Sequence, residues 1–161
     1  MPDRVPYTKF GLVDREVVLG DTGHAFLQKL FDGTHPAPPF SETCEVWPTE
    51  VEVGRIVFEA RPSARFYNPM GTVHGGWIST VLDSAMACAI HSKLKAGQAY
   101  TTVEMKVNFV RPLFDRTGKV RCEGRIVHLG SRMATSEGQL SDASGNLIAH
   151  GSETCMIMDA L

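Results

Sequence analysis

The 161-residue sequence has little net charge, no closely spaced cysteines and no long hydrophobic run. Its formal net charge is −2 and its Lys and Arg residues are scattered, which excludes the basic patch typical of nucleic-acid-binding proteins. The cysteines at positions 44, 88, 122 and 155 lie far apart, which excludes a CxxC zinc or redox pair. Counting alone permits two disulfides, but we expect reduced and mostly buried thiols.

Nothing in the sequence predicts secretion or insertion into a membrane. The start, MPDRVPYTKF, is polar and lacks the apolar segment of a signal peptide. The longest apolar run is too short and too interrupted to span a bilayer. We therefore expect a cytoplasmic protein with no membrane partner. The length suits one ordinary domain, and 43% hydrophobic with 21% charged residues is typical of a globular chain.

Charge is almost absent from the most apolar stretch, residues 66–92, FYNPMGTVHGGWISTVLDSAMACAIHS. Apart from histidines, its one formally charged side chain is Asp83, and Arg65 and Lys93 stand at its borders. Apolar residues recur there at i, i+3, i+4 and i+7, which predicts a long helix from about Gly75 to Gly97. Its predicted buried face comprises Ile78, Val81, Leu82, Ala85, Met86, Ala89 and Ile90.

The regions on either side of this helix predict one further helix and six strands. Residues 22–33 have apolar residues at helical spacing, with Thr22 or Asp21 as the cap, whereas residues 1–20 show no clear pattern. THPAPPF (34–40) is expected to be a proline-broken connector. The expected strands are 41–51, 54–62, 100–112, 119–130, 132–142 and 146–158.

This order predicts an α+β fold in which one sheet covers one long helix. Short connections make the last three strands an antiparallel meander. In residues 100–112 the alternation predicts two faces. Val103, Met105, Val107 and Phe109 fall on one side, and Thr102, Glu104, Lys106 and Asn108 on the other.

Asp83 is unexpected in the middle of a helix. Aspartate costs up to ~0.7 kcal/mol against alanine there, and burial costs more unless the carboxylate is hydrogen-bonded. One interpretation is an exposed side chain on a solvated face. The other is a carboxylate in a dry pocket, acting as general base or nucleophile. The neighbouring stripe favours the second, because a solvated face is normally rich in charge and this one holds Gly76, Thr80 and Ala87.

The tripeptide HGG at residues 74–76 stands where the helix is expected to begin. A helix N-terminus presents free N–H groups and a partial positive charge, and glycine lets a substrate carbonyl approach the backbone. This combination favours an oxyanion hole. The simpler interpretation is a structural histidine followed by a strained turn that needs glycine.

His74 and Asp83 are nine residues apart, roughly 13 Å along a helix that rises 1.5 Å per residue. A general base has to reach its target directly or through one water. The two ends therefore cannot act on one carbon within a single chain, and a site that uses both needs a second subunit. A two-fold dimer with antiparallel helices would bring Gly75 of one chain near Asp83 of the other.

The segments NPMGTVHGGWISTVLD and TTVEMKVNFVRP, with the strand–strand–helix–four-strand order, resemble hotdog-fold acyl-CoA thioesterases, in particular the PaaI-type (phenylacetate-pathway) branch. The resemblance covers about residues 41–158. It implies a hotdog domain over 41–161, after an N-terminal extension over 1–40 with a short helix. It also implies a dimer with a continuous sheet, commonly assembled into a homotetramer. The implied reaction is hydrolysis of an acyl- or aryl-CoA thioester without a metal, coenzyme A being part of the substrate rather than a cofactor.

The resemblance assigns five residues to catalysis. Asp83 matches the acid that attacks the thioester or activates water, and Gly75 matches the backbone N–H that polarises the carbonyl. His74 shapes that loop, and Asn68 orients the water or the thioester. Thr102 matches a Ser or Thr on the following strand. The resemblance implies that Asn68, His74 and Gly75 come from one subunit and that Asp83 and Thr102 come from the other.

Other assignments are less specific. A one-residue slip would exchange Thr102 with Thr101. Gly76 is a further candidate for contact with substrate. The phosphates of coenzyme A call for cations at the pocket rim, for which Arg111 and Arg132 are candidates, although both also suit a solvated surface.

Three other functions fit parts of this pattern. A hotdog hydroxyacyl-thioester dehydratase would pair His74 with Asp83 at one carbon, but its typical proline-rich GHFPxxP-like segment is absent. A non-catalytic acyl-CoA-binding or regulatory protein would not need the carboxylate. In a structural module, Asp83 would only hold a hydrogen-bond network.

Overall fold

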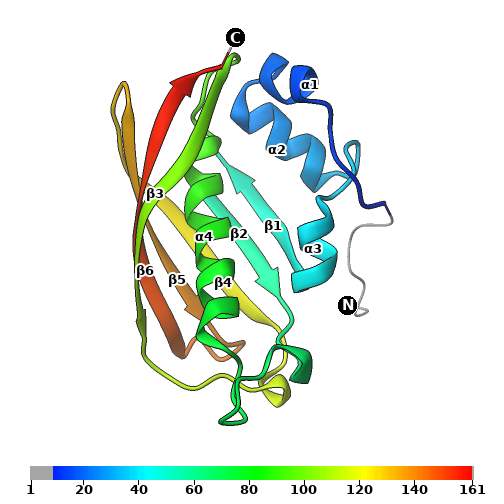
Figure 1. Ribbon diagram of the computed structural model, residues 1–161, viewed down its shortest axis with the longest axis vertical. Coiled ribbons are helices and arrows are strands. Elements are labelled where there is room, and N and C mark those ends of the chain that lie inside the picture. The colour runs from blue at the N-terminus through cyan, green and yellow to red at the C-terminus, as the bar shows by residue number, and fades with distance from the viewer. Residues whose placement is uncertain (1–8, 161) are drawn as a thin grey trace.

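The computed structural model describes residues 9–160 and shows one long helix, α4 (Gly75–His91), wrapped by a curved six-stranded sheet (Figure 1). All pairings are antiparallel and the strand order is β1-β2-β4-β5-β6-β3. This confirms the predicted α+β arrangement and the meander of the last three strands. The strands are β1 (Val46–Glu52), β2 (Arg55–Ala60), β3 (Gln98–Phe109), β4 (Val120–Leu129), β5 (Met133–Ser141) and β6 (Leu147–Asp159).

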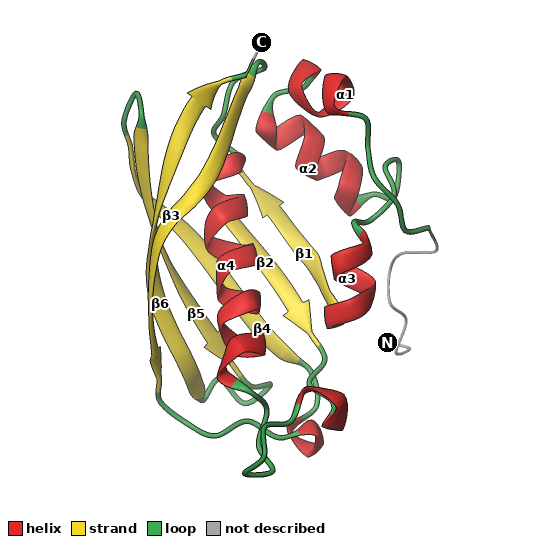
Figure 2. Ribbon diagram, in the orientation of Figure 1, coloured by secondary structure: helices red, strands yellow, loops and turns green. Residues whose placement is uncertain are grey.

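Three short helices precede the sheet: α1 (Arg15–Gly20), α2 (Gly23–Phe31) and α3 (Pro39–Cys44). Figure 2 shows them along the side of the molecule where β1 lies. The predicted cap of α2 is confirmed, because the Thr22 hydroxyl accepts a hydrogen bond from the Ala25 N–H. Helix α1 was not predicted, since its six residues bury only Leu19 and carry no helical period.

Helix α3 corrects two expectations. Residues 41–44 are helical rather than extended, so the first strand begins at Val46. The proline-rich segment does start a helix, because Pro39 occupies the first helical position, where its missing N–H costs nothing. Glu45, in the left-handed conformation at φ 53°, then ends the helix.

The predicted buried face of α4 is confirmed, since each of its seven apolar residues is at most 3% exposed. The helix ends at His91, earlier than expected. Beyond it, the Ser92 hydroxyl donates to the Ala89 carbonyl and accepts from the Gly54 N–H, which joins this end to the β1–β2 turn. Two 3₁₀ turns, η1 (Ala64–Phe66) and η2 (Asp115–Thr117), complete the elements.

A row of glycines lets α4 lie close against the sheet. Gly124, Gly138 and Gly151 face one another across β4, β5 and β6. A Cβ atom on Gly124 would lie 2.1 Å from the Ala85 carbonyl oxygen, and one on Gly138 would lie 2.7 Å from a Met86 side-chain carbon. A side chain at Gly124 or Gly138 would push the helix away from the sheet, whereas one at Gly151 would meet the Lys106 carbonyl of β3.

A β-bulge in β3 changes which face its residues present. The register shifts between Thr102 and Glu104, so Thr102 pairs with Cys155 while Met105 pairs with Glu153. Because Glu153 and Cys155 are two residues apart on β6, their partners Thr102 and Met105 share the helix-facing side. The regular alternation had placed Thr102 on the opposite side from Met105, which is wrong for this reason.

The structure also bears on the expected lack of a membrane-spanning segment and on the expected reduced cysteines. Among residues 9–160, no helix is long and apolar enough to cross a membrane. All four cysteines are free thiols, two of them buried and two partly buried.

Candidate active site

Asp83 stands in the middle of α4 and lines a cavity of about 300 Å³. The walls of this cavity come from α2, α3, β1, β2, α4 and β3 and are mostly apolar. Burial raises the pKa of Asp83 above its usual range, while a hydrogen bond from Thr102 would lower it. The residues around Asp83 in the cavity are Leu27, Leu30, Pro38, Phe40, Ser41, Val46, Pro48, Phe58, Ser84, Ala87, Cys88 and Tyr100.

Thr102 is the residue of β3 that meets this carboxylate. Its Oγ1 lies 3.3 Å from Asp83 Oδ1. The bulge after Thr102 produces this contact by turning its side chain toward α4. The neighbouring Thr101 pairs with Met156 and faces the other side of the sheet, so Thr102 is the one of the two adjacent threonines that contacts Asp83.

A second carboxyl group, which the sequence reasoning missed, lies behind Thr102. Glu153 of β6 is 1% exposed, and its Oε1 accepts hydrogen bonds from Thr102 Oγ1 at 2.7 Å and from Cys155 Sγ at 3.1 Å. Burial raises its pKa to about 7, with a smaller contribution from the charge of Asp83. The signal was present in the sequence, since the alternation of β6 places Glu153 on the same side as Gly151 and Ile157.

The loop before α4 forms a second cavity of about 380 Å³, lined in part by Asn68, Gly75 and Arg111. Asn68 uses its side chain to build the loop. Its Oδ1 accepts from the N–H groups of Met70 and Thr72, and its Nδ2 donates to Thr72 Oγ1. One hydrogen of this amide remains for a ligand.

His74 caps α4 and leaves the N–H of Gly75 free. The His74 Nδ1 accepts a hydrogen bond from the Gly76 N–H at 2.8 Å, which in a neutral ring places the proton on Nε2. Gly75 is the first helical residue, and its N–H has no hydrogen-bond partner within residues 9–160. A Cβ atom on Gly75 would lie 3.1 Å from the Phe109 ring, so glycine keeps this approach open.

The two cavities are separate within one chain. They share no lining residue, and Asp83 follows Gly75 by eight residues of continuous helix, roughly 12 Å. The structure thus brings Asp83 together with Thr102, and Asn68 together with Gly75 and Arg111, but it does not join the two sets.

Arg111 and Arg132 lie at opposite ends of the molecule. Arg111 lines the cavity beside Gly75. Arg132 is exposed in the β4–β5 turn, at the end of the sheet opposite the loop before α4 (Figure 1). Within one chain, these arginines cannot contact the same small group.

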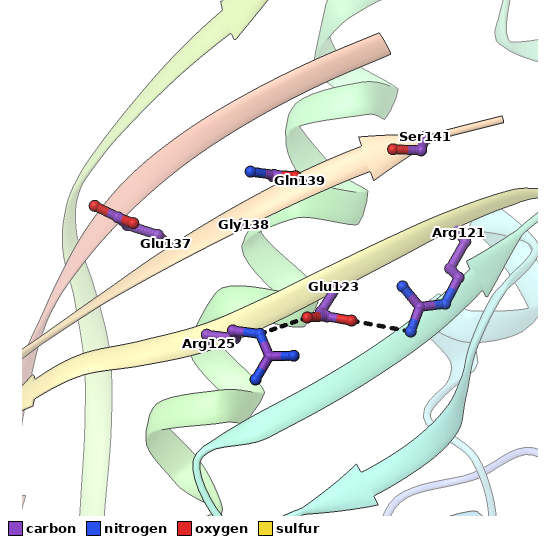
Figure 3. A pocket seen from close by; sticks show the side chains of 7 residues that line it. All are labelled: Arg121, Glu123, Arg125, Glu137, Gly138, Gln139 and Ser141. Atoms are coloured by element: carbon purple, nitrogen blue, oxygen red, sulfur yellow. Dashed lines mark hydrogen bonds and ion pairs between the residues drawn. The ribbon is translucent and has the colours of Figure 1, made fainter. Parts of the chain in front are cut away.

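A third depression, on the outer face of the sheet, is polar and remote from Asp83. Figure 3 shows Glu123 between Arg121 and Arg125 on β4. Arg55 also pairs with Glu123. The hydrogen bonds from these arginines outweigh burial and lower the pKa of Glu123 to about 2. The carboxylate is already neutralised by its neighbours, so this is a structural ion-pair cluster.

Comparison with known proteins identifies the family. Residues 70–149 match the family model described as Thioesterase superfamily. The chain is 30% identical to the proofreading thioesterase EntH of Klebsiella pneumoniae over 97 residues, which is 60% of this chain and 69% of that protein. The chain belongs to the thioesterase superfamily and is a thioester hydrolase.

Solved structures support the same conclusion. The phenylacetic acid degradation-related protein from Ralstonia eutropha JMP134 is 26% identical, covers 81% of this chain and 98% of its own, and superimposes with a TM-score of 0.74. The PaaI protein of the E. coli phenylacetic acid degradation operon shares the fold, with 17% identity, 86% and 92% coverage and a TM-score of 0.71. The predicted hotdog fold and PaaI-type family are confirmed.

Proposed function

We propose that this protein hydrolyses an acyl- or aryl-CoA thioester to the free acid and coenzyme A, at a site that two subunits share. The observation that carries this proposal is the Asp83 carboxylate at the wall of an apolar cavity, where partial burial makes it more basic than an ordinary aspartate. A carboxylate in such surroundings suits a general base or a nucleophile.

The proposed chemistry needs two groups on opposite sides of one carbonyl carbon. Asp83 either takes a proton from the attacking water or attacks the carbonyl carbon itself. The free N–H of Gly75 at the start of α4 donates to the carbonyl oxygen as negative charge develops there. The carbon–sulfur bond then breaks, and the coenzyme A thiolate leaves and takes up a proton. Where Asp83 is the nucleophile, the acyl group is left on its carboxylate as an anhydride, and a water molecule hydrolyses this anhydride to the free acid and restores Asp83.

A second copy of the chain would bring these groups together. β3 lies at the edge of the sheet and exposes Val103 and Phe109, and Val110 directly after the strand is exposed as well, each to at least 50%. An uncovered edge of this kind is a template for pairing with another strand. Two β3 strands paired around a two-fold axis would continue the sheet and set the α4 helices antiparallel, with Gly75 of one chain facing Asp83 of the other.

The cavity at Asp83 is the proposed acyl site. A cavity of about 150 Å³ holds benzene in another protein, so about 300 Å³ accommodates one aromatic ring with a short spacer or a medium-length alkyl chain. Apart from Asp83, the ionisable groups on its walls are the Cys88 thiol and the Tyr100 phenol, and burial raises the pKa of both. An uncharged aryl or medium-chain acyl group fits this lining.

Arg111 is the proposed partner for a coenzyme A phosphate, since it lines the cavity that contains Gly75. We also propose that Arg132 of the other subunit contacts a coenzyme A phosphate. In an antiparallel dimer, the end of one chain that holds Arg132 lies near the loop before α4 of the other chain.

The experiment follows thiol release from a panel of acyl- and aryl-CoA thioesters. We expect Asp83→Asn to fold and bind substrate but to lose roughly 10²–10⁴-fold in kcat, the usual contribution of a general base. Asp159→Asn, which changes an exposed aspartate at the end of β6, is the matched control and should keep full activity. Wild-type protein that binds these thioesters without releasing thiol would contradict the proposal and favour a binding or regulatory role.

A further inference from the structure

Glu153 is the most deeply buried carboxyl group among residues 9–160, and the chemistry proposed above does not use it. Its Oε1 accepts two hydrogen bonds, from Thr102 and Cys155, while its Oε2 is buried with no partner in this part of the chain. Leaving a buried polar atom unpaired is costly. A purely structural position would be filled more cheaply by an apolar side chain of similar size.

Thr102 connects this buried carboxyl to Asp83. A threonine hydroxyl has one proton and can donate only one hydrogen bond at a time. Thr102 Oγ1 lies 2.7 Å from Glu153 Oε1 and 3.3 Å from Asp83 Oδ1. The 2.7 Å contact lies within the usual O–H···O range and the 3.3 Å contact lies beyond it, which favours donation to Glu153 and leaves a lone pair of Thr102 toward Asp83.

We propose that Glu153 is a positioning residue, which holds the hydroxyl proton of Thr102 away from Asp83 and so keeps Asp83 basic. The proposal rests on Asp83 being the catalytic carboxylate. In this arrangement Thr102 donates its hydroxyl proton to Glu153 and can accept a hydrogen bond from protonated Asp83. Glu153 itself does not touch the substrate.

The orientation of the Thr102 hydroxyl affects the stability of both the ionised and the protonated form of Asp83. Ionised Asp83 receives no hydrogen bond from Thr102, so its charged form is not stabilised. Once Asp83 has taken a proton, its own hydroxyl can donate to the free lone pair of Thr102, which stabilises the protonated form. Both effects make the carboxylate a stronger base or nucleophile.

The surroundings of Glu153 favour its protonated, uncharged form. Ser136 of β5 stands directly opposite Glu153 in the sheet, and its buried hydroxyl likewise has no partner among residues 9–160. The ionisable groups around Glu153 are Asp83 and Cys88 from α4, Tyr100 from β3 and Cys155 from β6. None of them carries a positive charge that would favour the ionised form.

The first test measures the pKa of Asp83 directly in protein labelled with ¹³C-aspartate. Carboxyl NMR titration follows each aspartate, and the signal missing in Asp83→Asn identifies Asp83. Thr102→Val keeps the shape of the side chain and suits the exposed strand. We expect the pKa of Asp83 to fall or stay constant in this variant, because its protonated form loses an acceptor. A rise in the pKa would show that Thr102 donates to Asp83 and would overturn the proposal.

The second test compares two replacements of Glu153. Glu153→Gln keeps an oxygen that accepts the Thr102 proton and should leave the pKa of Asp83 unchanged. Glu153→Met removes the acceptor, so Thr102 turns to Asp83 and lowers its pKa by about one unit, the effect of one hydrogen bond to a charge. Equal pKa values of Asp83 in Glu153→Met and wild type would contradict the proposal.

These titrations also separate this inference from the proposed function. They need no turnover, so they report on Thr102 and Glu153 even if the protein hydrolyses none of the thioesters. If hydrolysis is confirmed, the acid limb of the kcat/KM profile should move with the NMR pKa in Glu153→Met and stay in place in Glu153→Gln. A uniform loss of kcat at every pH would indicate a merely structural role for Glu153 and would contradict the proposal.

Discussion

Two groups at the scale of single residues carry the proposed chemistry, the Asp83 carboxylate and the backbone N–H of Gly75. The N–H of Gly75 can be removed selectively, because the local backbone suits proline. Gly75 is the first residue of α4, where proline is favoured. His74 before it has φ −62° and ψ 136°, the extended conformation that a residue before proline prefers.

We therefore predict that Gly75→Pro folds and binds coenzyme A thioesters but loses roughly 10²–10³-fold in kcat, the usual cost of one oxyanion donor. Gly75→Ala is the matched control. It brings the same Cβ atom against Phe109 but keeps the N–H, so its kcat should stay much closer to wild type. Steady-state thiol release from both variants checks this. Equal losses in the two variants would mean that crowding at Phe109 matters and the N–H does not.

The sequence was sufficient to identify Asp83 as a candidate. It did not show that Thr102 and Glu153 lie beside it. An isolated carboxylate in a long uncharged stretch is a strong signal. The contact with Thr102 depends on a bulge that a regular period of two does not contain. Glu153 escaped notice because a single acidic residue in a polar-looking strand resembles an exposed one until its place in the alternation is followed.

At the scale of elements, α2 and α3 complete the cavity at Asp83. Leu27 and Leu30 of α2 and Phe40 of α3 line it, so residues before the first strand contribute to the proposed acyl site. Periodicity predicted α2, because it has a clear apolar face. It did not predict α3, whose six residues contain a proline usually taken as a helix breaker. The division at residue 40 into an extension and a hotdog domain stays a prediction.

Enlarging Leu30 should change substrate preference without changing the chemistry. We predict that Leu30→Phe lowers kcat/KM for long acyl groups by about 10–200-fold per methylene that no longer fits, while the shortest acyl groups are hydrolysed as by wild type. Phe31→Leu, at an exposed position of the same helix, is the control and should not alter the preference. The measurement is kcat/KM along a series of straight-chain acyl-CoA thioesters. A uniform change along the series would contradict a role of α2 in the acyl site.

At the scale of the whole molecule, one chain contains two half-sites rather than one site. The spacing of His74 and Asp83 in the sequence already predicted this separation, because a continuous helix fixes the distance between its ends. The order of the elements also predicted the fold, since one helix and one sheet leave few ways to bury their apolar faces. The hydrophobic pattern of the sequence does not determine how two copies associate, because exposed apolar side chains on β3 could pack against many different partners.

The measurement that tests the shared site most directly mixes two inactive chains. Asp83→Asn and Gly75→Pro are co-expressed in equal amounts with different tags. A shared site is intact only when an Asp83→Asn chain supplies the loop and a Gly75→Pro chain supplies the carboxylate. Random pairing in a two-fold dimer then predicts about a quarter of the wild-type thiol release per site. Mixed oligomers as inactive as the parent variants would contradict the account, because both groups would then have to act within one chain.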